Sequence, residues 1–404
     1  MKICIPSLVA TLAVALSPPV LAQDTAPPED SAAHDVTELP ETPSAAPALY
    51  PGMTGPLGFH PDPTKLNAGP LGDVYVTGIV SGIAQWQDSI FPGDRKTQAD
   101  LSNGQVFIQK ADGPLQFFVQ AGVYSLPDLG LPYLEATTAT KAFFGAIPQA
   151  FIKLAPTKNF SIIAGKLPTL IGAEYTFSFE NMNIQRGLLW NQENAVNRGV
   201  QANYTSGPVS VSVSVNDGFY SGKYNWIWGS VAYAIDSNNT LSIIAGGNVS
   251  HTNRSTLATP LAQNNGQIYN IILVSNQGDW TIEPYLQYTY VPRTPEVGIT
   301  QSASTYGGAL FVKYHAMEHF HLAARGEYIA STGSVANGAP SLIYGPGSKA
   351  WSFTVTPTYQ KGIFFARAEY SHVSAYDTTP GFVMGPDFND KKQNRLLLEA
   401  GFIF

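Results

Sequence analysis

Oppositely charged side chains recur at a spacing of two residues in the last quarter of the sequence. Arg325 lies two residues before Glu327, and Arg367 lies two residues before Glu369. Because successive side chains of a strand point to opposite faces, the members of each pair would share one face. Such charges can pair with each other and stabilise the wall that carries them, or they can act on a charged solute nearby. The elements that position them decide which chemistry applies.

Serine, histidine and acidic residues are present, but their spacing matches no familiar catalytic motif. No serine lies in a nucleophile elbow, and the glycine-rich stretch 345–347 lacks the spacing of a phosphate-binding loop. His315, His319 and His321 fall at a predicted turn, where solvated side chains are expected rather than metal ligands, which need convergent nitrogens. We therefore predict no metal, no cofactor and no catalytic residue. A triad assembled across strands is the remaining enzymatic alternative.

The clearest positioning element is the stretch 198–217, which reads RGVQANYTSGPVSVSVSVND. Apolar and polar residues alternate up to the turn 206–208, and valines then alternate with serines. This period of two predicts a two-stranded ribbon with one apolar and one polar face. A soluble sandwich would turn the apolar face inward, whereas a membrane barrel would turn it outward.

The composition favours the membrane barrel. Hydrophobic residues make up 44% of the chain and charged residues only 13%, about half the usual charged share of a soluble protein. A closed barrel satisfies its backbone polar groups without a charged surface. No run of 18 apolar residues follows the first two dozen, which argues against membrane helices. The sequence gives no sign of the basic surface that a nucleic-acid partner would require.

The N-terminal region divides into two predicted segments. Residues 1–22 have the charge, short apolar core and small-residue cleavage site of a signal peptide, and they contain the only cysteine, Cys4. Residues 23–70 are rich in proline, alanine and acids, and we predict a flexible periplasmic tail. The alternative is a segment that enters the barrel or binds a periplasmic partner, for which only 50–71 has the apolar residues.

Residues 71–404 are predicted to form a transmembrane, antiparallel, up-and-down β-barrel of about sixteen strands. Most segments have 9–11 residues, the length that a tilted strand needs to cross a bilayer. Pro284 and Pro357 fall inside two segments, and we expect each near a bulge or a strand end, because proline cannot donate to the ladder. The predicted strands are 74–86, 103–111, 115–124, 147–156, 160–167, 198–206, 208–217, 226–235, 240–250, 267–275, 279–290, 304–314, 320–330, 349–359, 363–373 and 394–404.

The predicted links alternate between tight turns and long loops without exception. Asp112-Gly113-Pro114 and Asn276-Gln277-Gly278 are typical of the tight turns, and 168–197 is the longest loop. Short periplasmic turns and long external loops produce this alternation in outer-membrane barrels. It predicts that both chain ends lie on the periplasmic side.

The last strand ends at a C-terminal phenylalanine. Leu396, Leu398, Ala400, Phe402 and Phe404 share one face. A closing strand of this kind is typical of Gram-negative outer-membrane barrels. We predict that Phe402 and Phe404 form a signal for the barrel-assembly machinery and that the apolar face meets outer-membrane lipid.

One block of the sequence resembles a known family. It contains Gly165-Lys166, Pro168, Gly172-Ala173-Glu174, Arg186-Gly187, Gly199 and Asn216. These positions are similar to those of the OmpL-like β-barrel porin family, although Asp217-Gly218-Phe219 stands where glycine and an aromatic residue are more usual. The motif block covers about 55 residues, and the architecture extends the resemblance to 71–404. The resemblance implies an outer-membrane channel for small solutes.

With the apolar face outward, the opposite face lines the lumen. Sixteen strands leave an aqueous pore rather than a packed core. Loop 168–197 is predicted to fold into the barrel and set the constriction, and the alternative is an external lid. The predicted pore-lining or constriction residues are Lys153, Glu174, Glu180, Arg186, Glu193, Glu283, Lys313, Arg325, Glu327, Arg367, Glu369 and Arg395, and Glu399 shares their face.

The sequence therefore predicts a porin in the outer membrane of a Gram-negative bacterium. It would pass small hydrophilic solutes and ions passively, without being an enzyme. One alternative is a plugged barrel that acts as a scaffold or receptor, and a second is an outer-membrane enzyme. A homotrimer is left open, as are the solute and the ion preference.

Overall fold

The computed structural model describes residues 49–404, so the predicted signal peptide 1–22 and most of the predicted tail 23–70 lie outside the described residues. Sixteen strands, β2 to β17, form a closed antiparallel barrel, which confirms the predicted fold class. The strands are β1 (Thr64–Asn67), β2 (Asp73–Gln87), β3 (Thr97–Lys110), β4 (Leu115–Tyr124), β5 (Gln149–Leu154), β6 (Phe160–Pro168), β7 (Val196–Ser206), β8 (Val209–Asn216), β9 (Trp226–Ala234), β10 (Asn239–Asn248), β11 (Gln267–Gln277), β12 (Trp280–Val291), β13 (Ala303–Met317), β14 (Phe320–Ser331), β15 (Lys349–Lys361), β16 (Phe364–Tyr376) and β17 (Lys392–Ile403).

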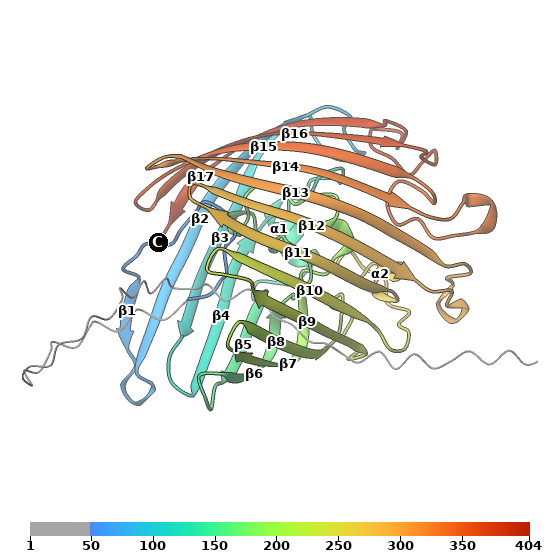
Figure 1. Ribbon diagram of the computed structural model, residues 1–404. Helices are drawn as coiled ribbons and strands as arrows, with labels where there is room; N and C mark the ends of the chain where they lie inside the picture. Colours follow the sequence, from blue (N-terminus) through green and yellow to red (C-terminus); the bar gives the residue numbers. More distant parts are fainter. Residues whose placement is uncertain (1–48) are drawn as a thin grey trace, which may run out of the picture.

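The barrel closes where β17 pairs with β2. The pairs run from Ile79–Ile403 to Gln87–Arg395. The short strand β1 pairs with the first residues of β2, beyond the end of β17. Figure 1 shows β1 and the C-terminal end of the chain at the same end of the barrel, and we call this the short-turn end.

Short and long links alternate along the chain, as predicted. Tight links such as 207–208, 278–279 and 362–363 gather at the short-turn end. The long links begin at the opposite end, and two of them contain α1 (Ala136–Ala142) and α2 (Leu261–Asn264) (Figure 1). Among residues 49–404, no helix combines the length and the apolar content needed to cross a membrane.

The side chains are arranged opposite to those of a soluble protein. Val200 and Val215 of the β7–β8 hairpin are about half exposed (51% and 48%), whereas Ser212 and Ser214 of the same hairpin are buried. A large exposed apolar surface is stable only when something apolar covers it. The outer face therefore fits contact with the hydrocarbon core of a bilayer.

Two early strands differ in length from the prediction. β3 begins at Thr97 rather than at residue 103, because residues 97–101 continue the ladder with the end of β2. β5 covers only Gln149–Leu154 rather than 147–156. Pro148 and Pro156, which flank β5, cannot donate to the ladder, so the apolar residues beyond its two ends do not extend the strand.

The two strand prolines are tolerated without a bulge. The β11–β12 pairing is interrupted beside Pro284 and resumes in the same register, and the β15–β16 pairing is interrupted in the same way beside Pro357. The expectation of a bulge or a strand end was therefore wrong. Each proline removes ladder bonds locally, and the flanking pairs keep the strands aligned.

The inner face is less polar than predicted. Phe107, Phe118, Phe151 and Ile163 of β3 to β6 all point inward and are buried in one apolar cluster. Loop and N-terminal residues cover them, including Phe177, Phe179 and Leu57, and half-buried Tyr50 and Phe59 pack against the cluster. These strands are thus apolar on both faces, because other parts of the chain fill that side of the barrel.

Residues 50–60 are not free of the barrel. The Leu57 side chain is 3% exposed, and the Tyr50 backbone bonds with the Gln109 amide of β3. For this piece of the predicted tail 23–70, the contacts agree with the alternative expectation of a segment that enters the barrel. Residues 23–48 lie outside the described part of the chain.

We predict that Phe404→Ala lowers the amount of folded barrel in the membrane. The Phe404 backbone exchanges two hydrogen bonds with Gly78 (2.7 and 2.9 Å), and its ring lies over that glycine, on the outer face. The change removes ring contacts at the seam where the barrel closes and the terminal residue that we expect the assembly machinery to bind. Quantifying heat-modifiable barrel in isolated membranes measures the effect. Phe382→Ala, in an exposed loop, is the matched control, and equal yields from both variants would contradict the prediction.

Candidate functional site: a loop folded across the barrel interior

The loop between β6 and β7 lies inside the barrel. Nearly all residues from 170 to 195 are buried. Phe177 and Phe179 join the apolar cluster of β3 to β6, whereas Ile171 and Leu188 join a second cluster with inward residues of β9 to β16. Apolar side chains thus fix the loop to both sides of the interior.

Two wall carboxylates bind backbone N–H groups of the loop. Glu369 of β16 accepts hydrogen bonds from the N–H groups of Ile184 and Gln185. Glu327 of β14 accepts from Leu188 and Leu189, at 3.1 and 3.3 Å. A carboxylate that accepts several backbone N–H groups forms charge-assisted bonds, which are stronger than bonds between neutral groups.

Three wall arginines bind loop carbonyl groups. Arg367 donates to the carbonyls of Ser178, Asn181 and Met182, at 2.9 to 3.0 Å. The Arg325 guanidinium donates to the Gln185 carbonyl and pairs with two carboxylates, one from the wall and one from the loop: Glu327 (3.1 Å) and Glu174. The wall therefore satisfies both backbone donors and backbone acceptors of a segment that has no strand of its own and only two short 3-10 helices, Ser178–Glu180 and Trp190–Gln192.

The third arginine, Arg395 of β17, donates to the Gln185 side-chain oxygen of this loop at 3.2 Å and also reaches a different loop. It donates to the carbonyls of Asp128 and Leu131 in the link between β4 and β5. That link also supplies the partner of Arg186, whose Nε lies 2.8 Å from Asp128 Oδ1. Arg186 further donates to the Thr176 carbonyl and stacks over Trp190. Sequence reasoning missed Asp128, because nothing local marks two distant loops as neighbours.

A glycine makes the closest approach of loop and wall. A Cβ atom added at Gly187 would lie 2.0 Å from Glu327 Oε1, and the Gly187 N–H donates to Glu174 at 2.7 Å. Only glycine fits between these two carboxylates without a displacement. The Arg186-Gly187 motif therefore serves as a docking point for the loop.

The two remaining loop acids are also bound. Glu180 accepts from the Phe177 N–H at 2.8 Å, and Glu193 accepts from the Tyr285 hydroxyl and the Gln287 amide of β12. Burial raises the pKa of both carboxyl groups, which belong to the loop rather than to a spanning strand. Neither group is a free lumen charge.

The remaining predicted residues lie near the short-turn end. Lys153 is on the inner face of β5 and forms no ion pair with any residue in 49–404. Lys313 of β13 donates to the Thr54 carbonyl at 3.2 Å, and Glu283 is buried on the adjacent β12. The predicted residues thus separate into a large group that holds the loop and a small group near the mouth.

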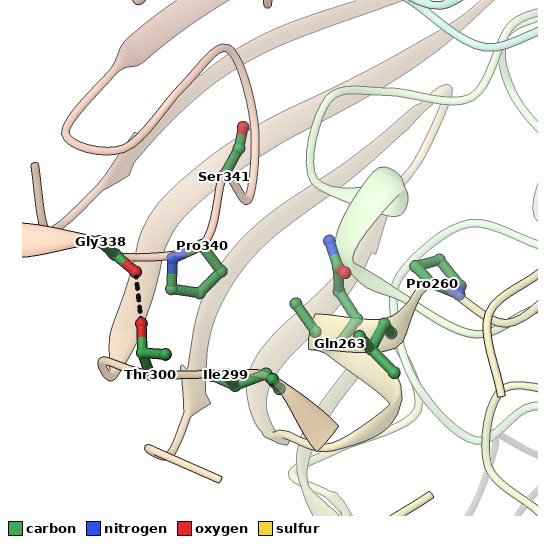
Figure 2. A pocket seen from close by; sticks show the side chains of 10 residues that line it. Pro260, Gln263, Ile299, Thr300, Gly338, Pro340 and Ser341 are labelled. Atoms are coloured by element: carbon green, nitrogen blue, oxygen red, sulfur yellow. Dashed lines mark hydrogen bonds between the residues drawn. The ribbon is translucent and has the colours of Figure 1, made fainter. Parts of the chain in front are cut away.

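The histidines, and a pocket between the long loops, carry no comparable chemistry. The His315 and His321 rings stack 4.5 Å apart, and within residues 49–404 no group of three or more metal-binding side chains converges. Figure 2 shows a pocket of about 360 Å³ between loops at the long-loop end, where Pro340 and Ile299 face α2. Its lining contains no ionisable residue.

A closed sixteen-stranded antiparallel barrel with an apolar outer face and a loop folded inside has the architecture of an outer-membrane porin. The sequence comparison agrees, because the model of the family "Putative beta-barrel porin-2, OmpL-like" matches residues 73–404. The chain belongs to this family. It is an outer-membrane porin channel, as the sequence predicted.

Solved structures show the same fold at low sequence identity. An anion-selective porin from Comamonas acidovorans has a TM-score of 0.56 at 12% identity, over 82% of this chain and 99% of that one. OmpT of Vibrio cholerae gives 0.55 at 12%, over 85% and 100%. Salmonella typhi OmpF, solved with daunomycin, gives 0.54 at 11%, over 84% and 100%. A comparison with curated proteins found no match.

Proposed function

We propose that this porin passes small hydrophilic solutes by passive diffusion and that loop 168–197 sets its constriction. The observation that carries the proposal is the binding of the loop to the wall by Arg325, Glu327, Arg367 and Glu369. Because the wall binds both the N–H groups and the carbonyl groups of the loop backbone, the loop narrows the sixteen-stranded lumen permanently. The solute must then pass beside the loop rather than displace it.

The charged residues of the wall fall into two groups, one that holds the loop and one that can act on passing ions. The predicted residues on β14, β16 and β17 are engaged by the loop, so their field is largely neutralised. Lys153 of β5 is half-buried on the inner face, without an ion-pair partner within residues 49–404. We propose that charge selection depends on Lys153 and Lys313 near the short-turn mouth rather than on the arginine-rich wall.

The proposed orientation places the short-turn end in the periplasm. Both β1 and the C-terminal end of the chain lie at this end (Figure 1). Short turns face the periplasm in outer-membrane barrels, and long loops face outward.

A homotrimer is a further proposal, supported by the OmpT of Vibrio cholerae that was solved in a trimer form and shares this fold with a TM-score of 0.54. Chemical crosslinking in membranes tests it.

A plugged barrel that acts as a scaffold or receptor is the second candidate. It is favoured by one observation, the burial of nearly the whole segment 170–195 inside the barrel. An outer-membrane enzyme has no comparable support, because no residue described above forms a catalytic arrangement. Solute flux separates a channel from a plugged barrel.

The test is single-channel conductance of the purified protein in a planar bilayer, with a salt gradient. We expect discrete ohmic steps, and a silent but folded barrel would overturn the channel proposal.

We also predict that Lys153→Glu shifts the cation-to-anion permeability ratio toward cations by about twofold or more, because it reverses a charge on the lumen wall that has no ion-pair partner within residues 49–404. Lys158→Glu, in the adjacent exposed turn, is the control. Equal reversal potentials for the two variants would show that Lys153 does not select ions.

A further inference from the structure

A segment before the barrel lies across its short-turn mouth. We call residues Tyr50–Phe59 the strap. Its first residue contacts β3, β4 and β5, its middle lies beside loop residue Glu180, and its end reaches Gln360 of β15. The strap therefore joins distant parts of the wall, and β1 then ties the following residues to β2.

Two wall glutamines bind the strap through its backbone. The Gln109 amide donates to the Tyr50 carbonyl and accepts from the Tyr50 N–H, both at 2.8 Å. The Gln360 amide does the same at Gly58, at 2.7 and 2.9 Å. An amide side chain that pairs with both backbone groups of one residue imitates a neighbouring strand, and this is a recognised way to hold an extended peptide.

The middle of the strap is also bound through its backbone, by the loop and by a wall lysine. The Glu180 carbonyl of the constriction loop accepts from the N–H groups of Thr54 (2.8 Å) and Gly55 (3.0 Å). Lys313 Nζ donates to the Thr54 carbonyl. The strap is therefore bound from β3, β13, β15 and the loop, mainly through main-chain atoms.

Apolar side chains anchor the strap beside these bonds. The Tyr50 ring lies 5.6 Å from Phe118 and 5.3 Å from Phe151, between ring centroids. The Phe59 ring lies 5.6 Å from Phe107 and meets that ring edge-on. Leu57 is buried in the same apolar cluster. The inward aromatics of β3 to β5, which a water-filled lumen does not need, thus form a lining for this segment.

We propose that the short-turn mouth is a binding site for an extended, aromatic-rich peptide, that the strap is its ligand within the same chain, and that strap occupancy restricts passage through the lumen. The restriction of passage rests on the proposed channel function, whereas the binding site does not. Backbone recognition by Gln109 and Gln360 gives affinity with little demand on sequence, and the pockets for Tyr50, Leu57 and Phe59 give selectivity. The site and the channel can therefore be tested separately.

A single substitution can expel the strap without altering its receptor. A Cβ atom at Gly55 would lie 2.3 Å from the Asn181 carbonyl oxygen, which is backbone and cannot move aside cheaply. Gly55→Val should thus block docking and leave every wall residue unchanged. His60→Val is the matched control, because His60 is the next residue after the strap and its side chain is exposed.

The first readout is thiol protection in the folded full-length protein. Cys4 is replaced by serine, and Leu57→Cys then supplies the only thiol for a maleimide probe. We expect the thiol to react at least about tenfold faster when Gly55→Val is added, a difference that corresponds to a tenfold population shift. His60→Val should leave the rate unchanged. Rapid labelling without Gly55→Val, as fast as that of an unstructured thiol, would overturn the binding site.

The second readout uses conductance and an added peptide. Gly55→Val should conduct more than the parent protein, and a synthetic peptide of residues 49–60 should reduce that conductance when added at the short-turn side only. The same peptide with Gly55→Val should have no effect. Faster labelling with unchanged, non-zero conductance would overturn the restriction of passage. A third outcome is possible, in which the Leu57→Cys thiol is protected in the parent but neither the parent nor Gly55→Val conducts. This outcome would reject the channel function and, with it, the restriction of passage by the strap.

Discussion

Deletion of residues 175–190 is expected to raise the single-channel conductance several-fold. This segment crosses the interior and fills it with Phe177, Phe179 and their neighbours, which are fully buried. The wall groups that hold it, chiefly Arg367 and Glu369, would be rehydrated in the opened lumen rather than left unpaired in a dry core. The deletion also removes the Glu180 carbonyl that binds the strap, so both obstructions in the lumen are lost together.

The matched control is a short deletion in an external loop. Residues 335–337 lie in the link between β14 and β15, and Val335 is 62% exposed. Their removal should leave conductance unchanged. If the 175–190 deletion yields a folded barrel with parental conductance, the loop does not set the constriction, and the narrowest point must lie among the external loops.

The strands could be predicted because their signal is local. In β8, valine and serine alternate between turn residues, and the structure places the valines outside and the serines inside. In β12, Trp280 and Leu286 face outward while Glu283 and Gln287 face inward. Each such pattern needs only a period of two and a turn at each end. In β3 to β6 the inward apolar residues weaken this alternation, but the turns still mark each strand end, so the number and order of the strands were recoverable from the sequence.

The interior could not be predicted in the same way. The partner of Arg186 is Asp128, which comes from another loop, and the partner of Tyr50 is Gln109, which lies in a strand 59 residues away. These contacts depend on which segments enter a closed space, and no periodicity encodes that. The one available signal was the inner face of β3 to β5, where Phe107, Phe118 and Phe151 occupy positions that an aqueous lumen would give to polar residues.

The loop inside the barrel also changes the role of the charged pairs on the wall. Two opposite charges on one strand face can pair with each other, and Arg325 does lie 3.1 Å from Glu327. From the sequence alone, the pairs could either stabilise the wall in this way or exert a field on passing solutes. Within the structure, both residues also bind the loop, through Glu174, Gln185 and the N–H groups of 188 and 189. The charges therefore act mainly on the protein's own backbone.

Arg325→Met is expected to detach the loop from the wall and to destabilise the barrel. The guanidinium is fully buried and is the shared partner of Glu174 and Glu327. Its removal leaves two carboxylates facing each other without a counter-charge, and loss of one partner of a buried pair typically costs about 3–5 kcal/mol. The free energy of unfolding in detergent, from a urea titration, measures the cost, and protease sensitivity of 170–195 measures loop release.

Two further variants separate this mechanism from a general loss of packing. Arg95→Met removes an exposed arginine, whose pair with Glu135 is 3.7 Å long, and should change stability little because surface pairs contribute little. Adding Glu174→Gln to Arg325→Met removes one of the opposed carboxylates and should recover part of the lost stability. If the double variant is no more stable than Arg325→Met alone, repulsion between the carboxylates is not the cause. The arginine would then act through its bonds to the Gln185 carbonyl and to the hydroxyl of Thr354 on the adjacent β15, and the loop would be held by its backbone contacts more than by charge.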